Sequence, residues 1–150
     1  MRSIFEPNAG QAIKQRISHL QPESERLWGK MNAAQAVAHL SIGIEQALGD
    51  VLPPRLLIGR LIGGYIKPKA LNGDTPMRRN SPTVPGSAVL DDRNFLAERD
   101  RLNGLIDRVI AGGPATCTTH PHSFFGKMTP EQWGILMYKH LDHHLRQFGV

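Results

Sequence analysis

The sequence predicts an all-α protein built as a helical bundle. Apolar residues recur at helical spacing in several segments, and prolines and glycines separate these segments. No stretch of useful length shows the alternation of apolar and polar residues that is typical of a strand. Because 150 residues match the size of one domain with a real core, we expect a single bundle domain over residues 1–150.

The first two helices have clear boundaries. The first covers about residues 9–20, with Ile13 and Ile17 at helical spacing, and Pro22 stops it. The second begins after Asn32, where Asn-Ala-Ala-Gln has the layout of a capping box, and it ends at residues 49–50, Gly-Asp.

A third, weaker helix is expected over about residues 54–66. Its segment 55–62 is basic and apolar and could lie on a membrane surface, but three glycines at 59, 63 and 64 favour a buried helix instead. Residues 67–90 then hold four prolines and two glycines without helical periodicity. A connection of this length in a small domain is typical of a functional loop or a crossover between helices.

Two further helices complete the predicted bundle. Asp91 or Asp92 is expected to cap the fourth, which extends to about Ile110 and is broken by the Gly-Gly-Pro at 112–114. The last helix has the strongest start signal, with Thr129 as N-cap, Pro at its first position and Gln at its third, and it should end near residue 147.

Composition excludes several classes of protein. The net charge is +5, but the basic residues are spread along the chain without a recognition motif, so no nucleic-acid partner is expected. The single cysteine, Cys117, excludes an internal disulfide and a cysteine-based zinc site. The longest apolar region, 56–66, is too short for a bilayer span and contains Arg60, and the N-terminus lacks a signal peptide. We therefore expect a cytoplasmic protein without a membrane partner.

The histidines of the last helix indicate a metal site. His140 and His144 lie one helical turn apart and share a face with Trp133 and Met137, so both rings should point into the core. His143 is rotated by about 100° from His144 and should not join them. A buried imidazole needs a partner, and the choice is between hydrogen bonds to polar groups and a metal ion.

His39, in the middle of the second helix, is the candidate for a third ligand. The alanines around it leave room for another helix to approach closely, although taken alone it could equally be a hydrogen-bonded core histidine. With His140 and His144 it gives the three-histidine pattern of an open metal site. Imidazole suits several divalent transition metals, of which zinc and nickel are the leading candidates.

The spacing of the pair is that of the HExxH signature of zinc proteases, but the catalytic residue differs. Leu141 stands where such a protease has its glutamate, so the general base is missing. Asp142 is expected to pair with Arg146 on the solvent side. The sequence therefore excludes a metalloprotease.

Other residues are candidates for catalysis or substrate binding. His122, in the loop before the last helix, could cover the site as an acid or base, or could simply pack on Phe residues 124 and 125. In the long connection Arg79 and Asn80 could orient an anionic substrate, although the arginine could also lie in solvent. Trp133 is a further candidate for contact with the substrate.

Several phrases of the chain resemble a known superfamily. An Ala-rich helix with one histidine, followed by a C-terminal helix with His140-x-x-x-His144 and Gln147, resembles the DinB/YfiT-like superfamily of metal-binding helical bundles. The phrase Leu-Trp-Gly-Lys-Met at 27–31, the phrase at 80–86 and the stretch from Lys139 are similar to one uncharacterised bacterial subfamily. The resemblance covers nearly the whole chain.

The resemblance implies a four-helix bundle with a long crossover loop and a short extra helix, often dimeric, with one metal bound by His39, His140 and His144. Better-known relatives are thiol-dependent transferases and isomerases. This implies a metal-dependent transferase that acts on a small molecule, uses a low-molecular-weight thiol and forms a homodimer. Ser123 departs from the subfamily, in which proline often follows the loop histidine. The alternative is a non-catalytic, stress-related metal-binding bundle or a dimeric interaction protein.

Overall fold

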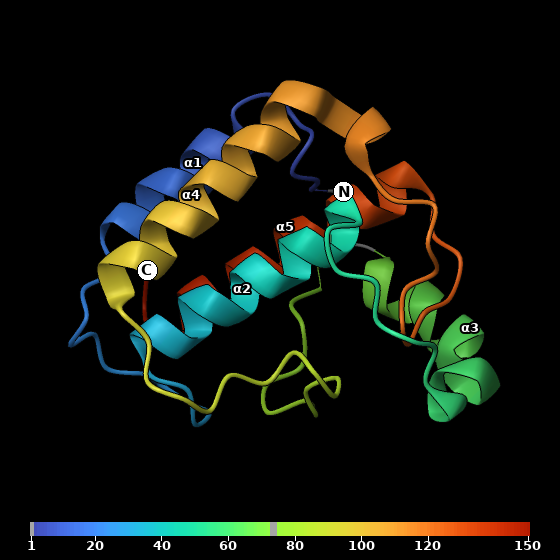
Figure 1. Ribbon diagram of the computed structural model, residues 1–150, viewed down its shortest axis with the longest axis horizontal. Helices are drawn as coiled ribbons and strands as arrows, with labels where there is room; N and C mark the ends of the chain where they lie inside the picture. The colour runs from blue at the N-terminus through green and yellow to red at the C-terminus, as the bar shows by residue number, and fades with distance from the viewer. Residues whose placement is uncertain (1, 73–74) are drawn as a thin grey trace.

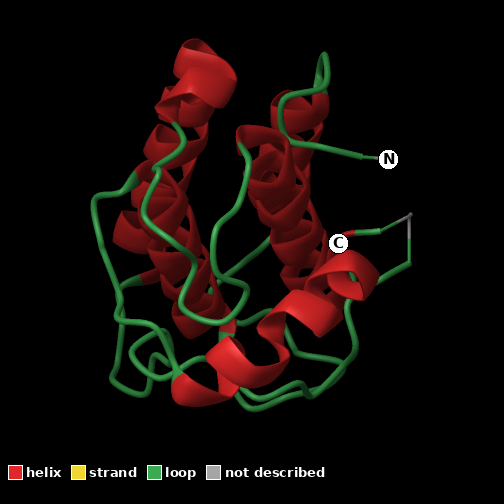
Figure 2. Ribbon diagram, turned by 90° about the vertical axis from the view of Figure 1, so that its right-hand side faces the viewer, coloured by secondary structure: helices red, strands yellow, loops and turns green. Residues whose placement is uncertain are grey.

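The computed structural model describes residues 2–72 and 75–150, and five α-helices carry the fold within these ranges (Figure 1). The helices are α1 (Ala9–Ser18), α2 (Ala33–Leu48), α3 (Leu57–Leu71), α4 (Phe95–Gly112) and α5 (Pro130–Gln147), and a short 3-10 helix, η1 (Gly113–Thr116), follows α4. Figure 2 shows helices and loops throughout the described residues and no strand. The all-α prediction is confirmed.

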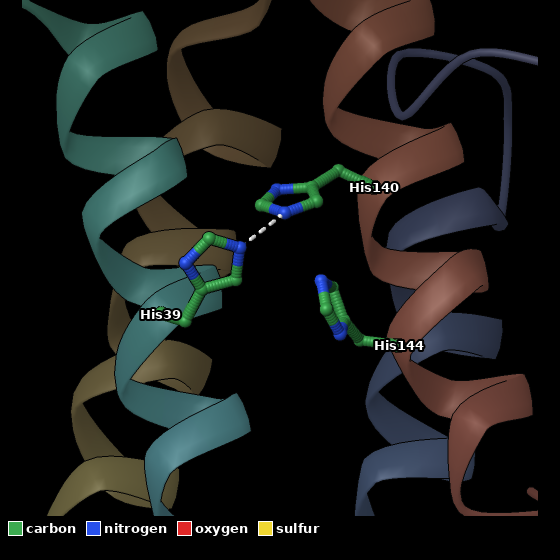
Figure 3. Close-up of side chains that lie close together, drawn as sticks. All are labelled: His39, His140 and His144. Carbon is green, nitrogen blue, oxygen red and sulfur yellow. Dashed lines mark hydrogen bonds between the residues drawn. The ribbon is translucent and has the colours of Figure 1, made fainter. Parts of the chain in front are cut away.

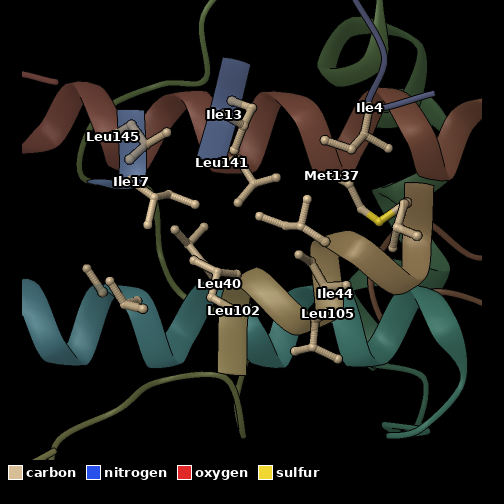
Figure 4. Close-up of a cluster of buried hydrophobic side chains, with 14 of the residues drawn as sticks. Ile4, Ile13, Ile17, Leu40, Ile44, Leu102, Leu105, Met137, Leu141 and Leu145 are labelled. Carbon is tan, nitrogen blue, oxygen red and sulfur yellow. The ribbon is translucent and has the colours of Figure 1, made fainter. Parts of the chain in front are cut away.

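Four of the helices enclose the hydrophobic core. α2 packs against α4 and α5, and α1 packs against the same two helices, so that each of the four contacts two others. Figure 4 shows the side chains that fill the space between them. Fully buried members of this core are Ile13, Ile17, Val37, Leu40, Leu102, Ile106, Val109, Leu141 and Leu145.

The helices that carry the candidate ligands start where the sequence indicates. Asn32 caps α2 by accepting a hydrogen bond from the Gln35 backbone N–H, and the Gln35 side chain accepts in return from the Asn32 N–H. Thr129 and Gln132 form the same capping box at α5. These reciprocal bonds satisfy N–H groups that have no partner within the helix, and so fix the first residue of each helix.

The predicted cap of the fourth helix is wrong. Asn94, and neither Asp91 nor Asp92, caps α4, because its side chain accepts a hydrogen bond from the Ala97 N–H. Asp91 pairs with Arg93 instead, at 2.9 Å. Asn is as good an N-cap as Asp, so short-range preference alone could not choose among these positions.

The third helix differs from its prediction in both length and exposure. α3 continues to Leu71 and includes Pro68, whereas the proline-rich stretch was expected to be non-helical from residue 67. Pro68 removes the partner of the Gly64 carbonyl, and Gly64 is exposed, so water can satisfy that carbonyl. The expected burial of the helix is also wrong, because only Gly59, Gly63 and the last residue, Leu71, are buried. No helix of the described residues is long and apolar enough to cross a membrane.

The connection from α3 to α4 passes beside α2. Ser87 is buried in this connection, where its carbonyl oxygen lies 2.6 Å from His39 Nδ1 and its hydroxyl accepts a hydrogen bond from Gln46. Residues 73 and 74 of the predicted loop lie outside the described residues. The long loop thus contributes to the surroundings of a candidate ligand.

Candidate metal centre

Three histidines from two helices meet in the core. His39 projects from α2, and His140 and His144 project from α5 toward it (Figure 3). Each offers one ring nitrogen, and these nitrogens all lie within 4.8 Å of one another. This cluster is the only group of three or more His, Cys, Asp or Glu within metal-binding distance among the described residues. The three side chains could hold a metal ion.

The hydrogen bond of His39 fixes which of its nitrogens is available. The Ser87 carbonyl can only accept, so His39 Nδ1 carries the hydrogen and donates at 2.6 Å. A neutral imidazole has one N–H, and His39 Nε2 therefore presents a lone pair toward the cluster. His140 Nε2 lies 2.8 Å from that atom and donates to it when no metal is bound. To bind a metal through Nε2, His140 would transfer its hydrogen to Nδ1.

His144 is oriented in the same way from the other side. Gln147 Nε2 donates to the Trp28 carbonyl at 2.7 Å, so the amide oxygen of Gln147 faces His144. His144 Nδ1 donates to this oxygen at 2.7 Å, and its Nε2 is left with a lone pair. Metal-binding histidines almost always donate their other N–H to a carbonyl, carboxylate or water, because this fixes the tautomer and the ring orientation.

A glycine allows the two helices to approach at His140. A Cβ atom at Gly43 of α2 would lie 2.9 Å from His140 Nδ1 and 3.1 Å from its Cε1. Real Cβ atoms essentially never come closer than 3.0 Å, so any side chain at this position would push the ring away. Gly43 lies one turn after His39, so the same face of α2 supplies a ligand and the space for its neighbour.

Burial keeps all three rings neutral. It lowers the pKa of His39, against the opposing effect of the Ser87 hydrogen bond. Burial, followed by the proximity of His39 and His144, lowers the pKa of His140 well below its usual value. Burial also lowers the pKa of His144 to about 3, although the Gln147 hydrogen bond opposes this. Neutral imidazole is the form that binds a metal, so the cluster needs no proton release near neutral pH.

The neighbouring residues on α5 point elsewhere, as their positions on the helix predict. His143 is absent from the cluster, and its ring meets the edge of Trp28 at a centroid distance of 5.8 Å. Asp142 pairs with Arg146 at 2.9 Å, as expected, and also with Arg16 of α1 at 2.8 Å. The second pair makes Asp142 a link between α1 and α5.

His122 has a defined role in its own loop. Its Nδ1 accepts hydrogen bonds from the backbone N–H groups of Phe124 and Phe125, both at 3.1 Å, and its ring stacks on Phe125. Burial and the charge of Arg55 lower the pKa of His122 to about 4, so it is neutral at pH 7. The contact with Phe125 agrees with the simpler of the two interpretations of His122, in which its ring packs on the loop phenylalanines.

The candidate substrate contacts lie in different places. Trp133 is buried, with its ring 5.5 Å from that of His122. Arg79 is exposed and lies over the Trp28 ring at 4.1 Å, which brings its charge close to His143. Asn80 is exposed and adopts a left-handed backbone conformation, with φ of 55°.

Three residues around the histidines were not predicted from the sequence as parts of the site. Ser87 contributes only a backbone oxygen, which no side-chain pattern can indicate. Gly43 gives a weak signal, since a glycine inside a helix costs about 0.5–1 kcal/mol relative to alanine and suggests a packing requirement. Gln147 could be noted for its position three residues after His144, one turn along the helix.

Replacement of Gly43 by alanine is expected to weaken metal binding on the order of tenfold, the lower end of what disturbed outer contacts cost. The added Cβ displaces the His140 ring, since it would lie 2.9 Å from Nδ1. Competition with a chromophoric chelator measures the change. Gly104→Ala in α4 is the matched control, because a Cβ there has no atom within 4 Å and should leave metal affinity unchanged. Equal affinity in the two variants would contradict the proposed approach of the helices.

The chain matches one protein family over nearly its whole length. Residues 3–149 match the family described as a protein of unknown function (DUF1569). The chain belongs to this family. No curated protein matches it, and no solved structure matches it. The family description assigns no activity, so the function has to be argued from the geometry of the three histidines.

Proposed function

We propose that this protein is a metal-dependent enzyme that holds one divalent transition metal, zinc or nickel, through His39, His140 and His144. The observation that carries the proposal is a set of three neutral imidazoles, two of them from buried residues and one from a partly buried residue, whose nitrogens lie within 4.8 Å of one another. Two of the rings have a hydrogen-bond acceptor at Nδ1 that directs the lone pair of Nε2 into the cluster. This donor set suits a borderline-soft metal.

The number of ligands favours catalysis over a structural role. Structural zinc sites are usually closed by four protein ligands, whereas catalytic sites have three and leave a position open. Within the described residues no carboxylate or cysteine joins the three histidines. A divalent metal with an open position lowers the pKa of a bound water or thiol and so supplies a nucleophile at neutral pH.

We assign the reaction to a transferase that uses a low-molecular-weight thiol, in keeping with the resemblance to the DinB-like superfamily. The protein's own residues would orient the reactants. Ser87 and Gln147 hold two of the imidazoles in place, and the guanidinium of Arg79, stacked on Trp28, could bind an anionic group of the substrate. With Leu141 fully buried in the core at the protease glutamate position, no general base for peptide hydrolysis is supplied there.

The second candidate function is a non-catalytic metal-binding bundle. It is favoured by the burial of two of the three histidines, since His39 and His144 are exposed by only 7% and 9%. The third ligand, His140, belongs to a partly exposed residue, so access of a substrate to the cluster is what a catalytic role requires. Whether an added thiol reaches the metal is therefore the measurement that separates the two functions.

Protein purified without a histidine tag is expected to contain about one transition-metal ion per chain. Elemental analysis measures this content, and titration of the metal-free protein with zinc or nickel tests uptake. Absence of metal together with absence of uptake would eliminate the proposal.

After substitution with cobalt, a low-molecular-weight thiol is expected to change the visible absorption spectrum, because sulfur enters the coordination shell of the metal. A panel of peptide substrates should remain uncleaved. An unchanged spectrum would favour the non-catalytic bundle, and metal-dependent peptide cleavage would contradict the assigned reaction class.

A further inference from the structure

The outer face of α3 is a large apolar surface with no partner among the described residues. Leu57 and Leu61 are exposed by 78% and 81%, and Tyr65, one turn further, by 72%. Ile58 and Ile62 are also exposed. At about 100° per residue these five side chains cover an arc of about 140° on one side of the helix. Folded monomers rarely leave so continuous an apolar surface exposed unless it binds something.

The attachment of α3 explains why this face points outward. Gly59 and Gly63 are buried against the backbone of Phe124, where a side chain at either position would collide with main-chain atoms. The Arg55 guanidinium donates to the carbonyls of residues 122 and 124, at 2.8 and 3.1 Å, and fastens the start of the helix to the same loop. α3 therefore lies on the outside of the four-helix core, as Figures 1 and 2 show.

The segment that contains α3 carries charge of one sign. The sequence from residue 51 to 72 contains no Asp or Glu and four basic residues, Arg55, Arg60, Lys67 and Lys69. Arg60 is exposed, and Lys69 lies over the Tyr65 ring at 4.4 Å, within the apolar arc. Interfacial helices combine an apolar face with basic side chains in this way, because the former enters the lipid and the latter meet anionic headgroups.

The same charges disfavour a second copy of the chain as the occupant. In a two-fold symmetric dimer the same surface of both subunits meets itself. Such an interface would bring Arg60 and Lys69 of two α3 helices close together, and residues 51–72 contain no acidic residue to compensate them. An anionic lipid surface supplies the opposite charge.

We propose that α3 is a membrane-surface helix that binds anionic phospholipid, with Leu57, Leu61 and Tyr65 in the interface and Arg60 at the headgroups. The glycines at 59, 63 and 64 led us to expect from the sequence that this helix is buried and does not lie on a membrane surface. Two of them serve to dock the helix on the loop, and a Cβ at Gly64 would have no atom within 4 Å, so none of them buries the apolar arc. The proposal does not depend on the metal centre.

Co-sedimentation of the full chain with lipid vesicles tests the proposal. The protein is expected to sediment with vesicles that contain phosphatidylglycerol and to stay in solution with vesicles of phosphatidylcholine alone. Raised salt should reduce binding, because it screens the charges. Sedimentation with neither vesicle type would overturn the proposal, and equal sedimentation with both would overturn the assignment to anionic lipid.

Leu61→Gln and Leu90→Gln form a matched pair of variants. Leu90 is exposed by 87% but lies outside α3, in the connection before α4. Leu61→Gln should weaken binding on the order of tenfold, which corresponds to losing the burial of one leucine side chain, and Leu90→Gln should bind as the wild type does. Equal binding by all three proteins would overturn the role of α3. A wild-type dimer in sedimentation velocity that Leu61→Gln dissociates, without vesicle binding, would assign the face to a second copy instead.

Discussion

His140→Ala is expected to lose stoichiometric metal, with affinity reduced by more than about 100-fold, the upper limit for losing only an outer contact. His140 Nε2 faces His39 Nε2 at 2.8 Å, and its ring lies between the other two histidines and Gly43. Removing it leaves two protein ligands, too few for a stable site in which neutral imidazoles are the only donors. Elemental analysis after gel filtration measures the loss.

His143→Ala is the control for that variant. The two positions lie on α5 and differ in the direction of the side chain, since His143 meets Trp28 rather than the cluster. His143→Ala should retain its metal, and both variants should keep the helical circular dichroism of the wild type, because an apolar core holds the four helices together. Metal loss in His143→Ala with retention in His140→Ala would mean that the assigned face of α5 is wrong.

The metal-free protein is expected to lose stability steeply between about pH 7 and about pH 5. Burial holds the pKa of His144 at about 3 and that of His122 at about 4, whereas an unfolded histidine titrates near 6.5. The folded pKa is thus depressed, so the stabilising contribution is present above about 6.5 and is lost as pH falls toward the folded value. Each of these two histidines should cost roughly 2 kcal/mol of unfolding free energy over that range.

Urea unfolding of chelator-treated protein at several pH values measures this loss. His39 and His140 should add to it, since burial lowers the pKa of both. Carboxylates titrate near about 4 and contribute little above about pH 5. His144→Gln should reduce the slope by about one proton. A free energy of unfolding that does not change from about pH 7 to about pH 5 would show that the histidines are not buried in neutral form.

The sequence predicts the helix boundaries correctly where interactions between neighbouring residues determine them. The capping boxes at Asn32 and Thr129 and the apolar spacing of α1, α2 and α5 depend on residues within one or two turns, and the structure confirms them. The cap of α4 and the end of α3 could not be read so well. Asn and Asp are equally good N-caps, so the residue types at 91, 92 and 94 do not distinguish the cap of α4. A proline usually ends a helix but did not end α3 at Pro68.

The arrangement of α3 is a tertiary outcome. Its apolar and basic residues are visible in the sequence, but whether Gly59 and Gly63 bury the helix or merely attach it depends on the Phe124 backbone, more than sixty residues away. Hydrophobic residues tend to be buried but are not always buried, since apolar atoms contribute much of the surface of every protein. The expectation of a buried helix failed for this reason.

The amino-acid sequence was sufficient to predict the helical class and the shared face of His140 and His144, because a helix turn of 3.6 residues fixes the direction of side chains four positions apart. The sequence identified His39 as a candidate ligand but did not show where its ring lies relative to the other two histidines. His39 and His140 are 101 residues apart in the sequence, and they meet because α2 packs on α5. The Ser87 carbonyl, the Gln147 amide and the space at Gly43 were also decided by the tertiary structure, because each acts through its position next to a histidine rather than through its place in a pattern.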